Sequence, residues 1–242
     1  MTSTVFSLAN VQLNFLSTTI NLTDTEAIIQ SGEFRYGENV LISNKKDYVK
    51  KLETANPYLR VLNIETIFPN KFVINAVERT ETYVFKLDNN KYAKTDEHLK
   101  ILTVSNVYQN NAENGIEIKN SSLTNQVSLT EGQFFEADDS FMTELFKCFR
   151  EWDDSYVALK SKIQSVELNY NSDSERMLIN MRSGVQIIVR KIKSNLSDKL
   201  NLVFSFYDLS TDKDGQPVDY TKSGIIEVFE NDSDIYASYR QV

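Results

Sequence analysis

The two most reactive side chain types occur once each in this chain, as His98 and Cys148. A thiol within hydrogen-bonding reach of an imidazole could serve as the nucleophile of a hydrolase, with the imidazole as its base. The neighbouring residues argue against this chemistry. His98 follows Asp96-Glu97 in a charged segment typical of a turn, whereas Cys148 falls on the apolar stripe of an expected helix. A buried thiol that resists alkylation would exclude this hydrolase.

Two further acidic motifs could form sites, but each lacks a necessary feature. The segment Asp212-Lys213-Asp214-Gly215 begins like a calcium loop, but Thr221 occupies the position of the bidentate glutamate. Asp138-Asp139 and Asp153-Asp154 could pair as acid and base, although the first pair fits a helix start and the second a solvated surface. We therefore predict no catalytic residues, no metal site and no cofactor, and thus no enzyme.

Composition and charge limit the possible classes of function. The chain has 242 residues, enough for one large or two small domains, and a net charge of −8. This negative charge disfavours a nucleic-acid binder, which needs a basic face against phosphates. A single cysteine allows no internal disulfide. The most apolar N-terminal stretch, residues 5–16, is too short to cross a membrane, which takes about 20 apolar residues.

The first 80 residues predict the order strand, helix, helix, strand, strand. A strand over residues 11–20 precedes the capping box Thr23-Asp24-Thr25-Glu26, which marks a helix start. Asn44 can cap a second helix, which Pro57 ends because proline lacks an amide hydrogen. A strand then leads into the turn Phe68-Pro69-Asn70-Lys71, and the residues after this turn alternate in polarity as in another strand.

The remaining residues predict a β-rich region with two helices. One helix begins at Ser140 and carries an apolar stripe, and another begins at Asn195 or Ser197. Residues 109–125 are polar and rich in asparagine, so we expect mainly loop there. The expected strands and hairpins cover residues 83–92, 99–108, 163–170, 176–182, 185–191 and 225–229.

Four motifs in the first 80 residues resemble those of a POTRA domain. They are the helix Thr23-Asp24-Thr25-Glu26-Ala27-Ile28-Ile29, the loop Gly37-Glu38-Asn39-Val40-Leu41, the helix exit Asn56-Pro57-Tyr58-Leu59, and the strand Phe72-Val73-Ile74-Asn75-Ala76-Val77-Glu78-Arg79. The resemblance implies a β-α-α-β-β domain over residues 1–82.

A single POTRA domain followed by β-rich sequence resembles the extracytoplasmic region of the FtsQ/DivIB cell-division family. Ser183-Gly184-Val185 is similar to the family's glycine-led strand, Lys199-Leu200 to its following helix, and Gly224-Ile225-Ile226-Glu227-Val228 to its final strand. The resemblance implies an α+β fold, with an FtsQ/DivIB-type β domain over residues 83–230 and a tail over 231–242. The proline usual after Glu78-Arg79 is missing, because Thr80 follows.

The resemblance also implies a function. The chain would be a non-catalytic scaffold of the divisome, anchored by a single N-terminal membrane helix that precedes residue 1, with this region on the outer side at the septum. Its partners would be DivIC/FtsB-like and FtsL-like division proteins. We expect the last strand to be an open sheet edge to which a partner strand adds. The expected contact residues are Ile225, Ile226, Glu227, Val228, Phe229, Glu230 and Tyr236.

Other interpretations remain open at this stage. Residues 225–229 could be a core strand that binds nothing, and Tyr236 could be an exposed tail residue. The POTRA domain could instead serve protein translocation or another envelope assembly, in which case substitutions at Ile226 or Val228 would not affect partners. The edge-strand hypothesis predicts that a charged residue or proline at either position abolishes partner binding while the fold stays intact.

Overall fold

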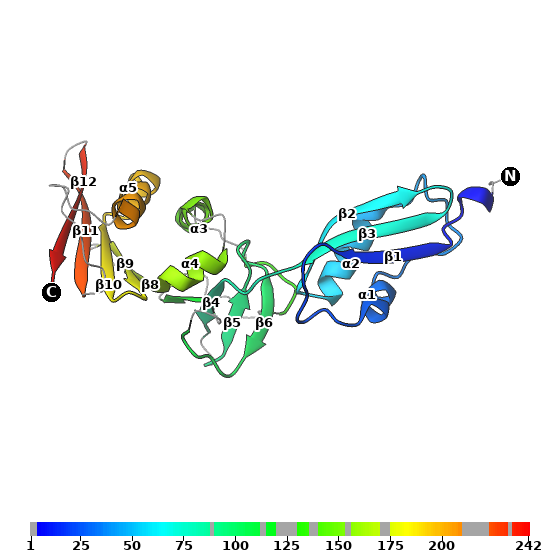
Figure 1. Cartoon of the computed structure of the whole chain (residues 1–242), viewed down its shortest axis with the longest axis horizontal. Helices are drawn as coiled ribbons and strands as arrows, with labels where there is room; N and C mark the ends of the chain where they lie inside the picture. Colours follow the sequence, from blue (N-terminus) through cyan, green and yellow to red (C-terminus); the bar gives the residue numbers. More distant parts are fainter. Residues whose placement is uncertain are drawn as a thin grey trace. The chain divides into compact units, whose positions relative to one another are not determined.

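A computed structural model describes residues 4–87, 90–111, 115–119, 130–135, 140–152, 156–169, 175–209, 223–231 and 234–242. The chain divides into two compact units (Figure 1). The first unit contains Met1–Thr80 and two short segments from later in the chain, Lys100–Thr103 and Thr130–Phe134. The second unit contains the other residues from Glu81 onwards.

The first unit is built on a three-stranded sheet in the order β1-β3-β2. The strands are β1 (Asn10–Phe15), β2 (Leu59–Ile67) and β3 (Lys71–Glu78), preceded by a short 3-10 helix, η1 (Thr4–Phe6). β1 runs parallel to β3, while β2 and β3 form an antiparallel hairpin. Together with two helices, these strands confirm the predicted order of strand, helix, helix, strand, strand.

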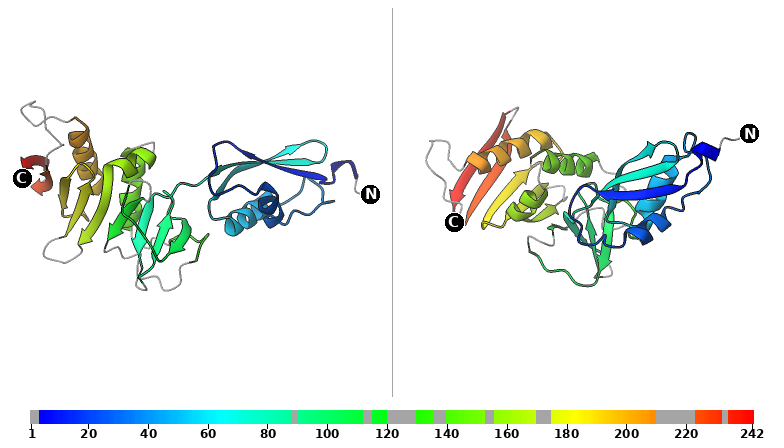
Figure 2. Two further views of the ribbon diagram at one scale, coloured as in Figure 1. Left: turned by 60° about the horizontal axis from the view of Figure 1, so that its bottom comes forward. Right: turned by 45° about the vertical axis from the view of Figure 1, so that its right-hand side comes forward.

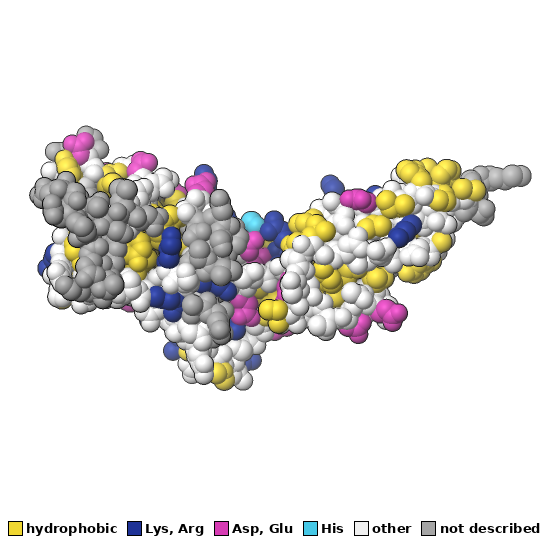
Figure 3. All heavy atoms as spheres, in the orientation of Figure 1, with side chains coloured by type: hydrophobic (Ala, Val, Ile, Leu, Met, Phe, Trp, Pro, Cys, Tyr) yellow, Lys and Arg dark blue, Asp and Glu magenta, His cyan; other side chains and the backbone are white. Residues whose placement is uncertain are grey.

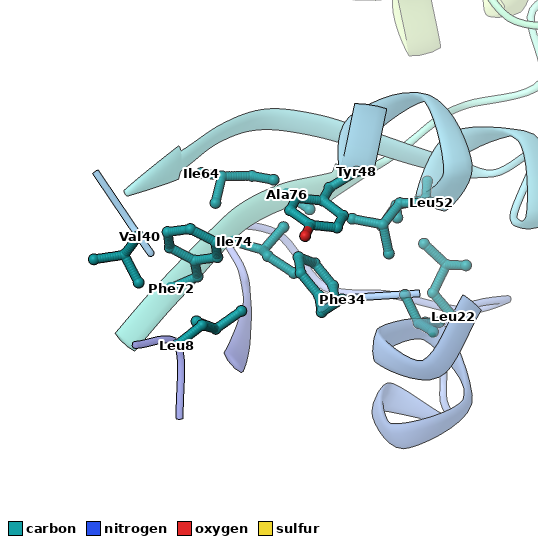
Figure 4. Packing of buried hydrophobic residues seen from close by; sticks show 12 residues of the cluster. Leu8, Leu22, Phe34, Val40, Tyr48, Leu52, Ile64, Phe72, Ile74 and Ala76 are labelled. Atoms are coloured by element: carbon teal, nitrogen blue, oxygen red, sulfur yellow. The ribbon is translucent and has the colours of Figure 1, made fainter. Parts of the chain in front are cut away.

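The helices α1 (Thr25–Ser31) and α2 (Lys45–Ala55) enclose the core of the first unit. Every second residue of β3 faces them, and Phe72, Ile74 and Ala76 are fully buried. Figure 4 shows these side chains packed against Tyr48 and Leu52 of α2. The predicted alternation of β3 is therefore confirmed, and the face that carries Phe72, Ile74 and Ala76 is the core face.

The start of α1 differs slightly from the sequence prediction. Asp24, rather than Thr23, is the N-cap residue, and its carboxylate accepts a hydrogen bond from the amide of Ala27 at 2.9 Å. Asn44 is the N-cap residue of α2 as expected, but its side chain makes no capping hydrogen bond. Asp24, at the N-cap of α1, also supplies negative charge to the positive end of that helix.

The adjacent Glu78 and Arg79 at the end of β3 hold two different parts of the first unit together. The Glu78 carboxylate accepts hydrogen bonds from the backbone amides of Ile20 and Asn21, which fixes the loop after β1. Arg79 is buried and donates to the carboxylate of Glu53 on α2 at 2.8 Å. This pair of charged residues thus fastens both the loop and a helix to the sheet.

The second sheet has nine described strands in the order β12-β11-β10-β9-β8-β7-β4-β5-β6. Parallel pairing joins β10 to β11, β7 to β8 and β4 to β7, and most other neighbours are antiparallel hairpins. The strands are β4 (Tyr83–Lys86), β5 (Tyr92–Thr95), β6 (Ile101–Ser105), β7 (Ile116–Lys119), β8 (Ile163–Asn169), β9 (Arg176–Met181), β10 (Val185–Arg190), β11 (Gly224–Asn231) and β12 (Asp234–Gln241).

Three helices accompany this sheet: α3 (Ser140–Trp152), α4 (Tyr156–Lys162) and α5 (Leu196–Leu209). α3 packs on β4 through an aromatic cluster in which Tyr83 lies 4.7 Å from Phe146, measured between ring centroids. Trp152 of α3 stacks on Phe204 of α5 at 3.7 Å. The apolar stripe predicted for α3 is confirmed as buried core, including Phe141, Leu145, Cys148 and Phe149.

Two strands occur where the sequence predicted none. β7 lies within the segment expected to be mainly loop, with Ile116 and Ile118 fully buried between β4 and β8. Its four residues are too few for the alternation to stand out from the polar sequence around them. β12 occupies most of the segment expected to be a tail. The calcium-like segment 212–215 and the acidic pairs 138–139 and 153–154 lie outside the described residues.

Candidate partner-binding surface

The expected edge strand is not at an edge. β11 pairs with β10 over residues 224–228 on one side and with β12 over residues 224–231 on the other, so residues 225–228 have no open backbone side. The prediction that a partner strand adds to these residues is therefore wrong. It failed because residues 234–241, taken as a tail, return as an antiparallel strand and cover β11 (Figures 1 and 2).

Alternate residues of β11 face α5, which contacts β10, β11 and β12. Ile226 and Val228 are fully buried on this side. The sequence analysis expected a charge or proline at either position to leave the fold intact. We correct that expectation, because a charge at a fully buried position or a lost ladder hydrogen bond in an interior strand destabilises the sheet itself.

Glu230 also faces α5 and forms an ion pair with a buried lysine. Lys199 of α5 is fully buried, and its Nζ lies 2.8 Å from Glu230 Oε2. Ser194 and Asn195 donate further hydrogen bonds to the same carboxylate at 2.8 Å each. The hydrogen bond from Lys199 is the main cause that lowers the pKa of Glu230 to about 2. Glu230 thus holds α5 against β11, an intramolecular contact that the sequence did not predict.

The opposite face of β11 presents partly exposed side chains. Glu227 pairs with Arg190 of β10, and Ile225 is half-buried on the same face. Phe229 lies opposite Tyr236 of β12, with ring centroids 5.7 Å apart and the rings stacked. Both rings remain substantially exposed, at 38% and 44% respectively. This aromatic pair, from the expected contact set, is an accessible apolar feature beside the sheet edge.

β12 is one edge strand of the described sheet, and β6 is the other. The amide of Val242 donates to the carbonyl of Ser223, so these two residues form a hydrogen-bonded pair of the ladder. Hydrogen-bonded and non-hydrogen-bonded pairs alternate in antiparallel strands. Ile235, Ala237, Tyr239 and Gln241 therefore point their backbone N–H and C=O groups away from β11. Among the described residues, no strand pairs with this side.

Sequence reasoning missed β12, although a signal was present. Residues 235–240 alternate between Ile, Ala and Tyr on the helix side and Tyr, Ser and Arg on the other side, which is a strand pattern. The exposure follows this pattern, since Ile235, Ala237 and Tyr239 are half-buried and their neighbours are exposed. Only two residues separate β11 from β12 in the sequence, and this short interval obscured the strand pattern.

The histidine and cysteine considered for hydrolysis have unfavourable surroundings. Cys148 is only 2% exposed, and burial raises the pKa of its thiol, which disfavours the reactive thiolate. His98 is partly exposed and lies 3.5 Å from Glu97. Within the described ranges, no cluster of three or more His, Cys, Asp or Glu residues could hold a metal ion.

Comparison with protein families agrees with the geometry of the first unit. Residues 17–79, which span α1, α2, β2 and β3, match the family model of the FtsQ-type POTRA domain. Residues 17–79 thus form a POTRA domain of the FtsQ type, which supports an FtsQ/DivIB-like protein. The larger β-rich unit with a few helices completes the predicted α+β architecture. No curated protein matches the chain.

The match to the FtsQ-type family also suggests a general role, that of a division-related scaffold. The FtsQ-type family comprises membrane-anchored division proteins that are known as non-enzymatic scaffolds and act with protein partners. None of the described helices combines the length and apolar character needed to cross a bilayer. β1 precedes the matched residues, yet it pairs with β3 along six residues, so the POTRA sheet of this protein extends beyond the match.

Proposed function

We propose that this protein is a non-catalytic scaffold of the bacterial divisome, located on the outer side of the membrane at the septum. It would bind DivIC/FtsB-like and FtsL-like proteins during septum formation. The observation that carries the proposal is the open edge of β12 next to an exposed aromatic pair. The binding mode is β-augmentation, in which a partner strand pairs with unsatisfied backbone groups.

Two features of β12 favour a specific partner strand. Its outward backbone groups, spaced two residues apart from Ile235 to Gln241, give a strand of this length several main-chain hydrogen bonds. The side chains next to the edge differ between the two faces of the sheet. Tyr236 and Phe229 offer apolar anchors on the open face, and aromatic residues are common anchors in interfaces. Backbone pairing would supply affinity, and these side chains would select the partner sequence.

The proposal is tested by proline substitutions at two adjacent residues of β12. Proline removes one amide hydrogen, and an edge strand tolerates this where that hydrogen faces solvent. Ala237→Pro removes an outward N–H, so we expect a similar melting temperature and at least tenfold weaker binding of the DivIC/FtsB-like partner. Ser238→Pro removes an inward N–H, so we expect it to lower the melting temperature. Binding would be measured by calorimetric titration.

Partner binding by Ala237→Pro at wild-type affinity, with the fold intact, would refute augmentation at β12. If the partner then binds through the POTRA domain alone, the alternative of an envelope assembly or translocation module becomes the better interpretation. Tyr236→Ser gives an independent measurement, because this exposed side chain contributes little to the core. We expect it to weaken binding about tenfold.

A further inference from the structure

One end of the POTRA domain carries apolar side chains that its core does not use. We call this end the N-terminal tip, and it comprises η1, the loop 39–42 and the turn between β2 and β3. Figure 3 shows hydrophobic side chains gathered at this end, next to the start of the chain. Its exposed apolar residues are Val5 (57%), Leu41 (57%), Ile42 (84%), Ile67 (46%) and Phe68 (62%).

Backbone contacts hold the three segments of the tip together. The amide of Val40 donates to the carbonyl of Phe6 at 2.9 Å, and the amide of Ala9 donates to Asn70 at 2.8 Å. The rings of Phe6 and Phe68 meet edge to face, with centroids 6.2 Å apart. The exposed side chains therefore project from an ordered surface rather than from loose ends.

Within the loop 39–42, the side chains divide between core and solvent. Val40 is 3% exposed and packs in the core, whereas the next two residues, Leu41 and Ile42, face outwards. Asn39 fixes this turn, because its side chain and its carbonyl accept hydrogen bonds from the amides of Leu41 and Ile42 respectively. The protein thus holds two large aliphatic side chains in water, which costs free energy unless something covers them.

Three lysines lie on the segments next to this apolar surface. Lys45 and Lys46 begin α2 three residues after Ile42, and Lys71 follows the turn that carries Phe68. Lys45 Nζ lies 5.3 Å from the centroid of the Phe72 ring, so its charge is held against the domain at the start of α2. Two acidic residues of the neighbouring segments are engaged within the domain: Glu38 accepts a hydrogen bond from Tyr48, and Asp47 pairs with Lys51.

We propose that the N-terminal tip rests on an anionic lipid bilayer. Apolar side chains with lysines on the adjoining segments match the interfacial region of a membrane, where acyl chains lie beneath negatively charged headgroups. Leu41, Ile42 and Phe68 enter the boundary between headgroups and acyl chains, and the lysines contact the headgroups. This contact goes beyond the proposed partner binding, because it involves neither β12 nor any division protein.

The test is co-sedimentation of the whole chain with vesicles. One set contains phosphatidylglycerol and phosphatidylcholine in equal parts, and the other contains phosphatidylcholine alone. We expect the protein to partition onto the anionic vesicles and to be released by salt. Leu41→Ser combined with Ile42→Ser should reduce partitioning at least tenfold. Lys45→Gln and Lys46→Gln should each reduce it about fivefold, because a lysine near an anionic surface contributes about 1 kcal/mol.

The matched control variants carry the same types of substitution at positions away from the tip. Ile20 is 83% exposed in the loop held by Glu78, at the opposite end of β1 and β3, and Lys50 is exposed further along α2. Ile20→Ser and Lys50→Gln should leave partitioning unchanged. Circular dichroism and an unchanged melting temperature would show that the tip variants are folded.

Absence of sedimentation with anionic vesicles at millimolar lipid would overturn the proposal. An equal loss of vesicle partitioning for the tip variants and for their controls would also overturn the proposal. If the wild type does not bind vesicles but the tip variants lose a protein partner, the tip is a protein-binding surface and not a lipid contact. None of these outcomes affects the β12 hypothesis, which is measured by partner affinity.

Discussion

The fully buried Lys199 of α5 is paired with Glu230 of β11 at 2.8 Å, and this contact fastens the helix to the strand beside the sheet edge. The same ammonium group donates to the carbonyls of Lys191 and Ser194 at 2.9 and 2.8 Å. Among the described residues, the ammonium group of Lys199 is held by Lys191, Ser194 and Glu230, and of these Glu230 carries a compensating charge. A buried cation that loses its anion is costly, so the position of α5 depends on this carboxylate.

We predict that Glu230→Gln lowers the melting temperature at neutral pH. Because the folded pKa of Glu230, about 2, is below its ordinary value of 4.5, its stabilisation is complete above pH 4.5 and is lost as pH falls towards 2. The difference in melting temperature between the wild type and the variant should shrink over this interval. Glu227→Gln is the control, because its partner Arg190 is half exposed. An equal effect of both variants would contradict the prediction.

A second prediction concerns Glu53 on α2. Its carboxylate accepts hydrogen bonds from Arg79 at 2.8 Å and from Lys100 at 3.3 Å, and both cations are buried. Glu53→Gln removes the carboxylate charge that these two cations share, so we expect the free energy of unfolding to fall by about 2 kcal/mol. Chemical denaturation would measure this change.

The control for Glu53 is Glu33→Gln, which removes an exposed pair with Lys51. Exposed pairs contribute less than about 1 kcal/mol, so this variant should be nearly neutral. Similar losses for Glu53→Gln and Glu33→Gln would show that burial of the two cations does not determine stability at this position.

A third prediction concerns Gly224 at the start of β11. A Cβ atom at this position would lie 2.5 Å from the ring of Tyr239, which packs over the glycine from β12. Gly224→Ala must displace the ring, and we expect the free energy of unfolding to fall by about 1–3 kcal/mol. In a Tyr239→Ala background the same change should cost far less. Additive effects in this double-mutant cycle would contradict a direct clash.

The sequence alone determined the POTRA domain and much of its core. Alternating polarity places Phe72, Ile74 and Ala76 on one face of β3, and the structure buries all three. Such patterns are local, since they follow from the geometry of a single strand or helix. For the same reason the apolar stripe of α3 identified Cys148 as a core residue rather than a nucleophile.

Only the tertiary structure decided which strand lies at the edge. Residues 225–229 have the composition of a strand whether they lie at the edge or in the interior, because edge position depends on which other segments pair with them. The return of residues 234–241 against β11 moved the open edge to β12, while Ile226 and Val228 are buried and Glu230 pairs with the buried Lys199. Likewise, the apolar run Val40-Leu41-Ile42 does not reveal that one residue enters the core while two face outwards, since that division depends on η1 and the β2–β3 turn packing beside the loop.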